Sequence, residues 1–158
     1  MQSTEVEQYI QLLEHYDEAG DLETPVGFTT DDYYALRDEI TQFIVDLEKL
    51  DLRLNVKRYD AQDAACICRL NIYLRKEEPK SENLELGLIF SFFGKMVAVS
   101  EYDGYSLGQE FIGRVEALLA AHGFRVIPQE ILNQPYTGKR GHYKARNHSW
   151  LIRFFSEV

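Results

Sequence analysis

The sequence predicts an α+β protein in which a mostly antiparallel sheet of about five to six strands is covered by two N-terminal helices and one later helix. Apolar residues recur with helical period in two segments before residue 50 and in one after residue 105. Between residues 52 and 100 the period changes to two, and short turns separate the alternating runs. Consecutive strands joined by such turns favour an antiparallel sheet. At 158 residues the chain fits one domain, residues 1–158.

A first helix is expected to begin near Thr4, which has the spacing of a capping box with Glu7, and to end near Gly20. Its buried stripe consists of Val6, Ile10 and Leu13. A second helix is expected to begin at Thr29 or Thr30. The apolar face of this second helix comprises Tyr33, Leu36, Ile40, Phe43, Leu47 and Leu50.

Alternation of apolar and polar residues predicts four strands in succession. They cover residues 52–57, 66–75, 84–92 and 96–100. Gly94-Lys95 is expected to form a hairpin turn between the last two. Other turns are expected over residues 60–63 and at Asp103-Gly104.

The last third of the chain predicts a helix and two further strands. The helix begins after Ser106, which has capping-box spacing with Gln109, and ends at His122-Gly123. A short strand over residues 124–127 and one helical turn over 128–132 follow. Residues 133–148 have no apolar period and are expected to form a loop, and Trp150 to Phe155 a closing strand.

Charge is distributed unevenly along the chain. Residues 1–50 contain thirteen acidic residues (Asp and Glu) and two basic residues (Lys and Arg). Residues 131–158 contain one acidic and five basic residues. Residues 51–130 contain twelve acidic and ten basic residues, and the whole chain has a net charge of −9. An uneven charge distribution selects partners and accelerates their association without determining the fold.

Several classes of function find no support in the sequence. Cys66 and Cys68 lie within the best strand, as buried reduced thiols do, and no histidine is placed beside them, so no catalytic residues and no enzyme are predicted. The acidic residues lack the spacing of a metal site, and no cofactor motif occurs. With no apolar run of about 18 residues and no signal core at the N-terminus, a cytoplasmic protein without membrane contact is expected.

Acidic residues and tyrosine at the two N-terminal helices point to a surface for a basic protein. Tyrosine anchors interfaces, and carboxylates attract cations. The residues predicted to bind the partner are Glu14, Asp17, Glu18, Asp31, Asp32, Tyr34 and Asp38. A second interpretation is that acids at a helix start serve only as caps.

A basic segment interleaved with tyrosine, residues 136–148, offers an alternative site. Basic side chains bind phosphates, and neighbouring aromatic side chains stack on nucleobases. The alternative ligand-binding residues are Lys139, Arg140, His142, Lys144 and Arg146. A third interpretation is that this segment pairs with the acidic helices, either within one chain or in a dimer.

The segment Asp31-Asp32-Tyr33-Tyr34 resembles, in composition, the acidic Tyr-Tyr helix of colicin-DNase immunity proteins, which are all-helical. In its predicted organisation the chain is similar to α+β immunity proteins of bacterial polymorphic-toxin and contact-dependent-inhibition systems. Ser91-Phe92-Phe93-Gly94-Lys95 and the segment from Trp150 to Phe155 contribute to that similarity. The resemblance implies a protein that binds one toxin and blocks its active site.

These observations lead to a hypothesis of a non-catalytic, immunity-type inhibitor. Its acidic N-terminal helices would block a basic partner such as a nuclease toxin, whose active site must attract phosphates. The alternative is a small protein that binds nucleic acid or a phosphate ligand through residues 136–148. The oligomeric state is not predicted.

Overall fold

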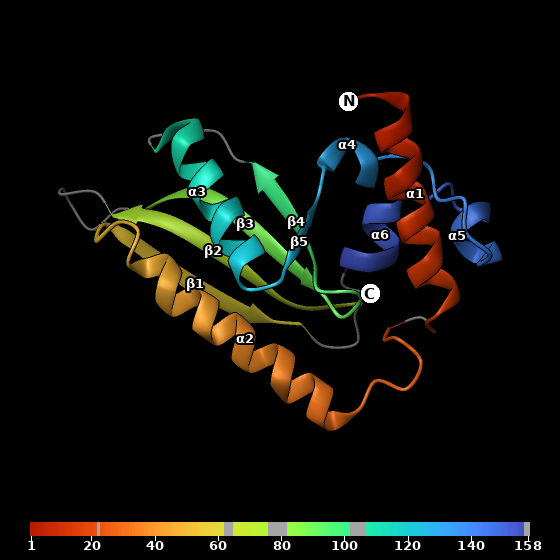
Figure 1. Ribbon diagram of the computed structural model, residues 1–158, viewed down its shortest axis with the longest axis horizontal. Helices are drawn as coiled ribbons and strands as arrows, with labels where there is room; N and C mark the ends of the chain where they lie inside the picture. Colours follow the sequence, from red (N-terminus) through yellow and green to blue (C-terminus); the bar gives the residue numbers. More distant parts are fainter. Residues whose placement is uncertain (22, 62–64, 76–81, 102–106, 157–158) are drawn as a thin grey trace.

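The computed structural model describes residues 1–158 except 22, 62–64, 76–81, 102–106 and 157–158. The expected α+β class is confirmed: the described residues form one five-stranded sheet accompanied by helices (Figure 1). The helices are α1 (Ser3–Glu18), α2 (Thr30–Glu48), α3 (Gly108–Ala121), α4 (Gln129–Leu132), α5 (Gly141–Ala145) and α6 (Trp150–Phe155). The strands are β1 (Leu54–Asp60), β2 (Cys66–Arg75), β3 (Glu82–Ser91), β4 (Met96–Glu101) and β5 (Arg125–Ile127).

The sheet has the order β1-β2-β3-β4-β5. The first four strands are antiparallel neighbours, as expected of strands joined by hairpins, and β5 lies parallel to β4. The parallel pair arises because α3 connects the two strands, and such a crossover returns the chain in the same direction. Gly94 and Lys95 form the predicted turn between β3 and β4. Their φ values of 56° and 52° are both left-handed, as a two-residue hairpin turn requires.

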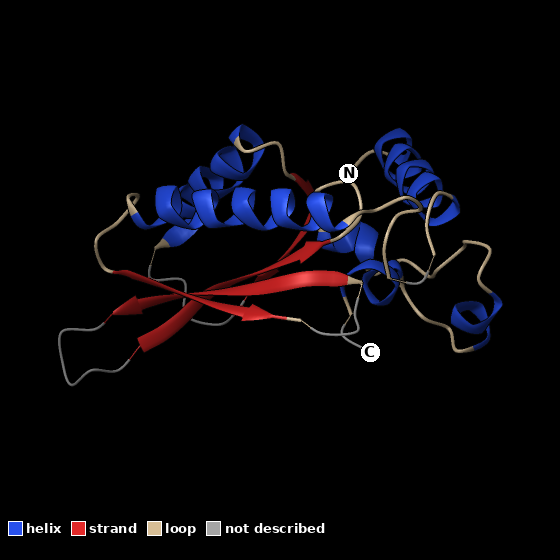
Figure 2. Cartoon of the chain, turned by 90° about the horizontal axis from the view of Figure 1, so that it is seen from below, coloured by secondary structure: helices blue, strands red, loops and turns tan. Residues whose placement is uncertain are grey.

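Helices α2 and α3 cover one face of the sheet (Figure 2). Between them and the sheet lies a hydrophobic cluster that we call the first core, which includes Phe43 of α2, Leu70 and Ile72 of β2, Phe90 of β3 and Phe111 of α3. Thr29 is the N-cap of α2, as predicted, and its hydroxyl accepts a hydrogen bond from the backbone N–H of Asp32. The buried residues of α2 match the predicted stripe: Leu36, Ile40, Phe43 and Leu47. Each recurs at helical spacing, so the helix directs all four at the sheet.

A second core, which includes Leu13, Met96, Ile131 and Trp150, lies where α1, α4 and α6 meet, with α4 against β4 and α6 against β3. Val97 of β4 belongs to the first core, whereas its neighbours Met96 and Ala98 belong to the second. Alternate side chains of one strand therefore serve two cores. Figure 1 shows α1 beside α4 and α6, at the opposite end of the molecule from α3.

The prediction of a closing strand from Trp150 to Phe155 is wrong, because these residues form helix α6. Trp150 and Phe154 stack at 5.8 Å between ring centroids, one helical turn apart. A run of six residues with a single charge fits both a buried strand and a buried helix, so periodicity could not separate them. Residues 141–145, expected to be loop, form the short helix α5.

Smaller differences concern the ends of elements. Helix α1 begins at Ser3, and Glu5 rather than Glu7 accepts the capping hydrogen bond, from the N–H of Gln2. Of the turn expected over residues 60–63, Asp60 is the last residue of β1, and residues 62–63 lie outside the described residues. The expected cap at Ser106 and the turn at Asp103-Gly104 also lie outside them.

Candidate functional site

The C-terminal end of α1 and the basic segment lie against each other in the same molecule. Asp17 is 4% exposed, although sequence reasoning took it for a surface residue. Its Oδ1 lies 2.6 Å from Nε of Arg153, which is 0% exposed. Its Oδ2 accepts hydrogen bonds from the hydroxyl of Tyr136 at 2.6 Å and from the backbone N–H of Lys139 at 3.3 Å.

Besides its ion pair with Asp17, Arg153 contacts a backbone carbonyl and two aromatic rings. Its Nη2 donates to the carbonyl of Asp21 at 2.6 Å. Its guanidinium lies 4.9 Å from the ring centroid of Phe93 and 4.7 Å from that of Phe154. Removing two charges from water costs several kcal/mol each unless hydrogen bonds replace the lost hydration. The partners of Asp17 and Arg153 provide that replacement, so the pair is held in one geometry.

Arg140 and Gly138 bring the basic segment close to this pair. Arg140 donates through Nη2 to the carbonyl of Gly20, and its Nε lies 3.7 Å from Oδ1 of Asp17. A Cβ atom at Gly138 would overlap the Asp17 carboxylate and the Tyr136 ring, so only glycine permits the approach. We call Asp17, Tyr136, Arg140 and Arg153 the Asp17 cluster.

Burial, followed by the hydrogen bond to Asp17, raises the pKa of Tyr136 to about 12 from 10.0. Burial also raises the pKa of the Cys68 thiol to about 12 from 9.0. A raised pKa means that the folded state retains a proton that the unfolded chain loses first. The stabilisation from these two protons is complete below the ordinary pKa values and is lost as the pH rises toward 12.

The free energy of unfolding is therefore expected to fall between about pH 9 and pH 12. Urea denaturation at a series of pH values measures this slope. Tyr136→Phe should flatten the part above pH 10, and Cys68→Ala the part that begins near pH 9. A slope unchanged in both variants would contradict the assignment.

The remaining α1 candidates are also engaged with the basic segment. Glu14 accepts a hydrogen bond from the hydroxyl of Thr137 at 3.1 Å. Glu18 forms an ion pair with Lys139 at 2.9 Å, and both side chains are more than half exposed. Such a surface pair contributes at most about 1 kcal/mol. Of the interpretations that the sequence left open for residues 136–148, the structure therefore shows pairing within the chain for Lys139 and Arg140.

Three residues of the basic set remain on the surface. His142, Lys144 and Arg146 are exposed, on α5 or at its end. The His142 ring lies 4.2 Å from the ring of the buried Tyr143. These three residues form a smaller basic surface than the sequence suggested.

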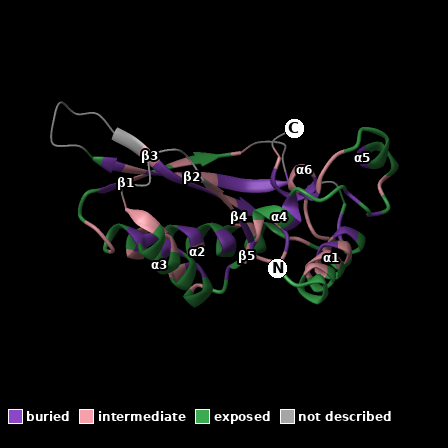
Figure 3. Cartoon of the chain, turned by 90° about the horizontal axis from the view of Figure 1, so that it is seen from above, coloured by how far each residue is buried: buried purple, intermediate pink, exposed green. Residues whose placement is uncertain are grey.

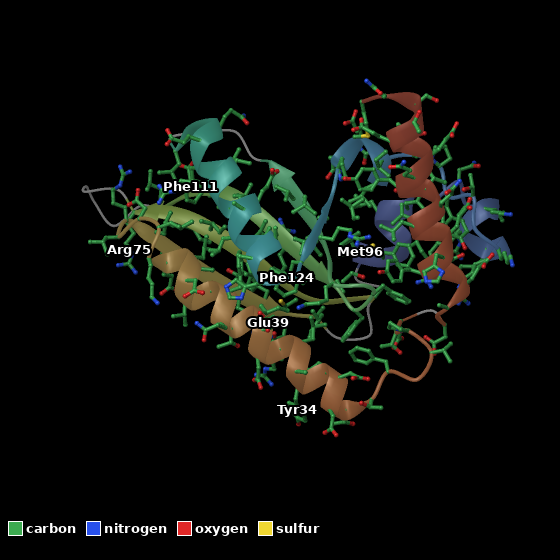
Figure 4. The ribbon with its side chains drawn as sticks, in the orientation of Figure 1. Tyr34, Glu39, Arg75, Met96, Phe111 and Phe124 are labelled. Atoms are coloured by element: carbon green, nitrogen blue, oxygen red, sulfur yellow. The ribbon has the colours of Figure 1, made fainter. Side chains whose placement is uncertain are left out.

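The candidates on α2 lie apart from the basic segment. Asp31, Tyr34 and Asp38 are exposed, and Tyr34 has 54% of its surface accessible. They follow one another at helical spacing, so they share the side of the helix that faces away from the sheet. Figure 4 shows Tyr34 projecting outward near the N-terminal end of α2. We call these three residues the outer face of α2.

Asp32 has a structural role on the same helix. Its Oδ2 accepts a hydrogen bond from the N–H of Thr29 at 2.9 Å, which completes a capping box. The interpretation that acids at the helix start serve as caps therefore holds for Asp32. Tyr33, expected on the apolar stripe, packs against the first core.

Beside this face lies a groove of about 440 Å³ that sequence reasoning missed. Phe28 and Phe92 line it with their rings 5.5 Å apart, and Asp32, Glu39 and Lys95 contribute charged groups. Phe28 follows a turn at Gly27, and Phe92 follows β3. No local pattern in the sequence indicates that segments more than sixty residues apart meet here.

His122 joins α3 to α2 next to the groove. Its Nδ1 lies 2.9 Å from Oε1 of Glu39, and its Nε2 lies 2.9 Å from Oδ2 of Asp46. The hydrogen bond with His122 is the main reason why the pKa of Asp46 is lowered. The contact holds the end of α3 against α2, and it leaves one oxygen of Glu39 for other interactions.

The described residues contain no group of three or more His, Cys, Asp or Glu that could hold a metal ion. Cys66 and Cys68 are buried, and the raised pKa of Cys68 keeps its thiol protonated. A protonated, buried thiol is a poor nucleophile.

Within the described part of the chain, no helix is long and apolar enough to cross a membrane. Comparison with known proteins adds no relative: no protein-family model, curated protein or solved structure matches the chain.

Proposed function

We propose that this chain is a non-catalytic binding protein that docks a basic protein partner on α2, as an immunity-type inhibitor of a nuclease toxin would. The observation that carries the proposal is that Asp32, Ala35 and Glu39, which line the aromatic groove, each follow a residue of the outer face of α2, about a quarter turn around the helix. One surface thus combines carboxylates, an exposed tyrosine and a recess with an aromatic wall.

This combination suits a cationic partner. Carboxylates accelerate the association of a basic protein and hold it in register. A partner Lys or Arg that enters the groove would meet the rings of Phe28 and Phe92 and the carboxylates of Asp32 and Glu39. Cations are attracted to aromatic faces by about 0.5–2 kcal/mol. A nuclease active site is rich in such cations because it must bind phosphates.

The proposal is narrower than the surface expected from the sequence. Glu14, Asp17 and Glu18 are used within the molecule, so they contribute little to a docking surface. The alternative function at residues 136–148 has weaker support for the same reason. Lys139 and Arg140 contact α1, which leaves His142, Lys144 and Arg146 for a phosphate ligand.

Charge reversal on α2 tests the proposal. Asp31→Lys with Asp38→Lys is expected to weaken binding to a cationic partner at least tenfold, because attraction becomes repulsion. Tyr34→Ala is expected to cost about 2 kcal/mol, roughly thirtyfold in affinity, if Tyr34 anchors the interface. The ligands to immobilise are the product of the reading frame adjacent to this one and a panel of basic nucleases.

A matched control separates the α2 surface from overall charge. Glu7→Lys with Glu116→Lys changes the net charge equally at exposed positions of α1 and α3. This variant should retain the affinity of the unmodified protein. Equal weakening by this variant and by the α2 variant, or no binding to any cationic protein, would overturn the proposal.

A further inference from the structure

The face of the sheet opposite α2 carries polar and aromatic side chains. Successive side chains of a strand point to opposite faces of the sheet. In β1 and β2, the side chains that do not point into the first core therefore lie on this face. The register places Asn55 opposite Tyr73, Lys57 opposite Asn71, and Tyr59 opposite Arg69. In Figure 3, α2 and α3 lie below the sheet, and among the described residues no helix lies above β1 and β2, whereas α6 contacts β3. We call Asn55, Lys57, Tyr59, Arg69, Asn71, Tyr73 and Arg75 the helix-free face.

Side chains on this face hold one another in place. Arg69 donates from Nε to the amide oxygen of Asn71 at 3.0 Å. Asn71 donates in turn from its amide nitrogen to the hydroxyl of Tyr73 at 3.3 Å. Nζ of Lys57 lies 4.9 Å from the centroid of the Tyr73 ring. Side chains fixed in this way lose little conformational entropy when a ligand binds.

The face is flat toward β3. Gly87 of β3 is the neighbour of Asn71 on one side and of Ser100 on the other. Because glycine has no side chain, nothing rises from the sheet at this position. Tyr59, at the β1 edge, is 47% exposed. A planar ligand can therefore approach the Tyr59 ring, whereas the ammonium group of Lys57 lies over the Tyr73 ring.

The seven β1 and β2 residues of the helix-free face together carry a net positive charge, whereas the whole chain has a net charge of −9. Lys57, Arg69 and Arg75 contribute three cations from two adjacent strands. By contrast, α2 and α3 together carry eight Asp and Glu but two Arg. The outer side of a helix about 10 Å thick lies beyond the screening length of about 8 Å at physiological ionic strength. Repulsion from the acidic helices is thus weak at the helix-free face.

We propose that the helix-free face binds single-stranded nucleic acid. Tyrosine rings stack on nucleobases, and Lys and Arg contact the phosphates that follow one another along a strand. Asn71 uses one amide N–H on Tyr73 and one oxygen lone pair on Arg69, so its second N–H and second lone pair can meet the edge of an unpaired base. An acidic protein would match the cations, but it would leave the exposed ring of Tyr59 unused. A second copy that docks its acidic α2 would also match the cations, and the test distinguishes it.

This inference goes beyond the proposed function, since it concerns the opposite side of the molecule. The probe is a fluorescein-labelled single-stranded oligothymidylate, and fluorescence anisotropy measures its binding. Tyr59→Ala is expected to weaken binding about tenfold, because one stacked base contributes that much or more. Tyr59→Phe should restore it, since the ring remains.

Charge and salt give a second measurement. Lys57→Glu with Arg75→Glu should reduce binding beyond detection. Three phosphate contacts predict about twentyfold weaker binding in 200 mM than in 50 mM salt. The matched control is Arg37→Glu with Lys49→Glu, which changes the net charge equally at exposed positions on α2 and at its C-cap, on the other side of the sheet. This control should bind like the unmodified protein, and thermal unfolding verifies that every variant is folded.

Three outcomes would overturn the proposal. The first is no binding of the oligonucleotide at 50 mM salt. The second is equal affinity for duplex and single strand with no effect of Tyr59→Ala, which would indicate a non-specific polyanion site. The third is a dimer in sedimentation velocity that Lys57→Glu dissociates and the oligonucleotide does not, which would assign the face to a second copy. Binding that resists Asp31→Lys with Asp38→Lys but not Tyr59→Ala would support this inference whatever the fate of the α2 proposal.

Discussion

Asp17→Ala is expected to lower the free energy of unfolding by about 3–5 kcal/mol, the effect of leaving a buried charge without its partner. Arg153 is 0% exposed, and the substitution would leave its guanidinium in a dry site beside two aromatic rings. Tyr136 would lose its hydrogen-bond acceptor at the same time. A loss of this size is large beside the total stability of a domain, about 5–15 kcal/mol. Urea denaturation at neutral pH measures the change.

A double-mutant cycle shows whether the loss comes from the pair. Asp17→Leu with Arg153→Met removes both charges, so the double variant should be less destabilised than the sum of the single variants by about 0.5–3 kcal/mol. The control is Glu18→Ala, which removes a carboxylate from an exposed ion pair one residue away and should cost at most about 1 kcal/mol. Additive single effects, or an equal cost for Glu18→Ala, would contradict the central role of the Asp17 cluster.

Phe43→Ala is expected to lower the free energy of unfolding by about 3–5 kcal/mol, because it removes a buried ring from the first core. The Phe43 ring is completely buried between α2 and the sheet. Its centroid lies 5.9 Å from that of Phe90, 6.3 Å from that of Phe124, and 5.8 Å from that of His122. Removing the ring leaves a cavity. Because other contacts hold α2 and α3 in place, the two helices cannot move enough to close it completely.

Val45→Ala is the matched control on the same helix. Val45 is 45% exposed, so its truncation should change the stability by no more than about 0.5 kcal/mol. Thermal and urea unfolding of both variants measure the difference. Equal effects at the two positions would mean that α2 does not direct Phe43 at the sheet and Val45 at the solvent.

Much of the fold could be predicted because most helices, strands and turns show a pattern of residues that are close in sequence. The stripe through Leu36, Ile40 and Phe43 predicted α2 and the face that it buries, and the cap at Thr29 was predicted as well. Alternation predicted β2, and the Gly94-Lys95 pair predicted the hairpin. Each of these features depends on residues close in sequence. The segment from Trp150 to Phe155 was assigned wrongly because its apolar run has no clear period.

The candidate site was harder to predict than the fold. An aspartate near a helix end looks the same in sequence whether it is solvated, as Asp38 is, or buried, as Asp17 is. The groove beside α2 depends on Phe28 and Phe92, which only folding brings together. The helix-free face was present in the alternation of β1 and β2. Its charge and aromatic content become apparent once the register pairs Lys57 with Asn71 and Tyr59 with Arg69.

By itself, the sequence determined the α+β class, most helices and strands, and the separation of acidic from basic residues. Only the tertiary structure decided which charges remain on the surface. Arg153 and Tyr136 meet Asp17 across 136 and 119 residues of chain. Contacts of this kind follow from how elements pack and not from local period. Packing at the end of α1 neutralises one part of the acidic surface, and the outer face of α2 remains exposed.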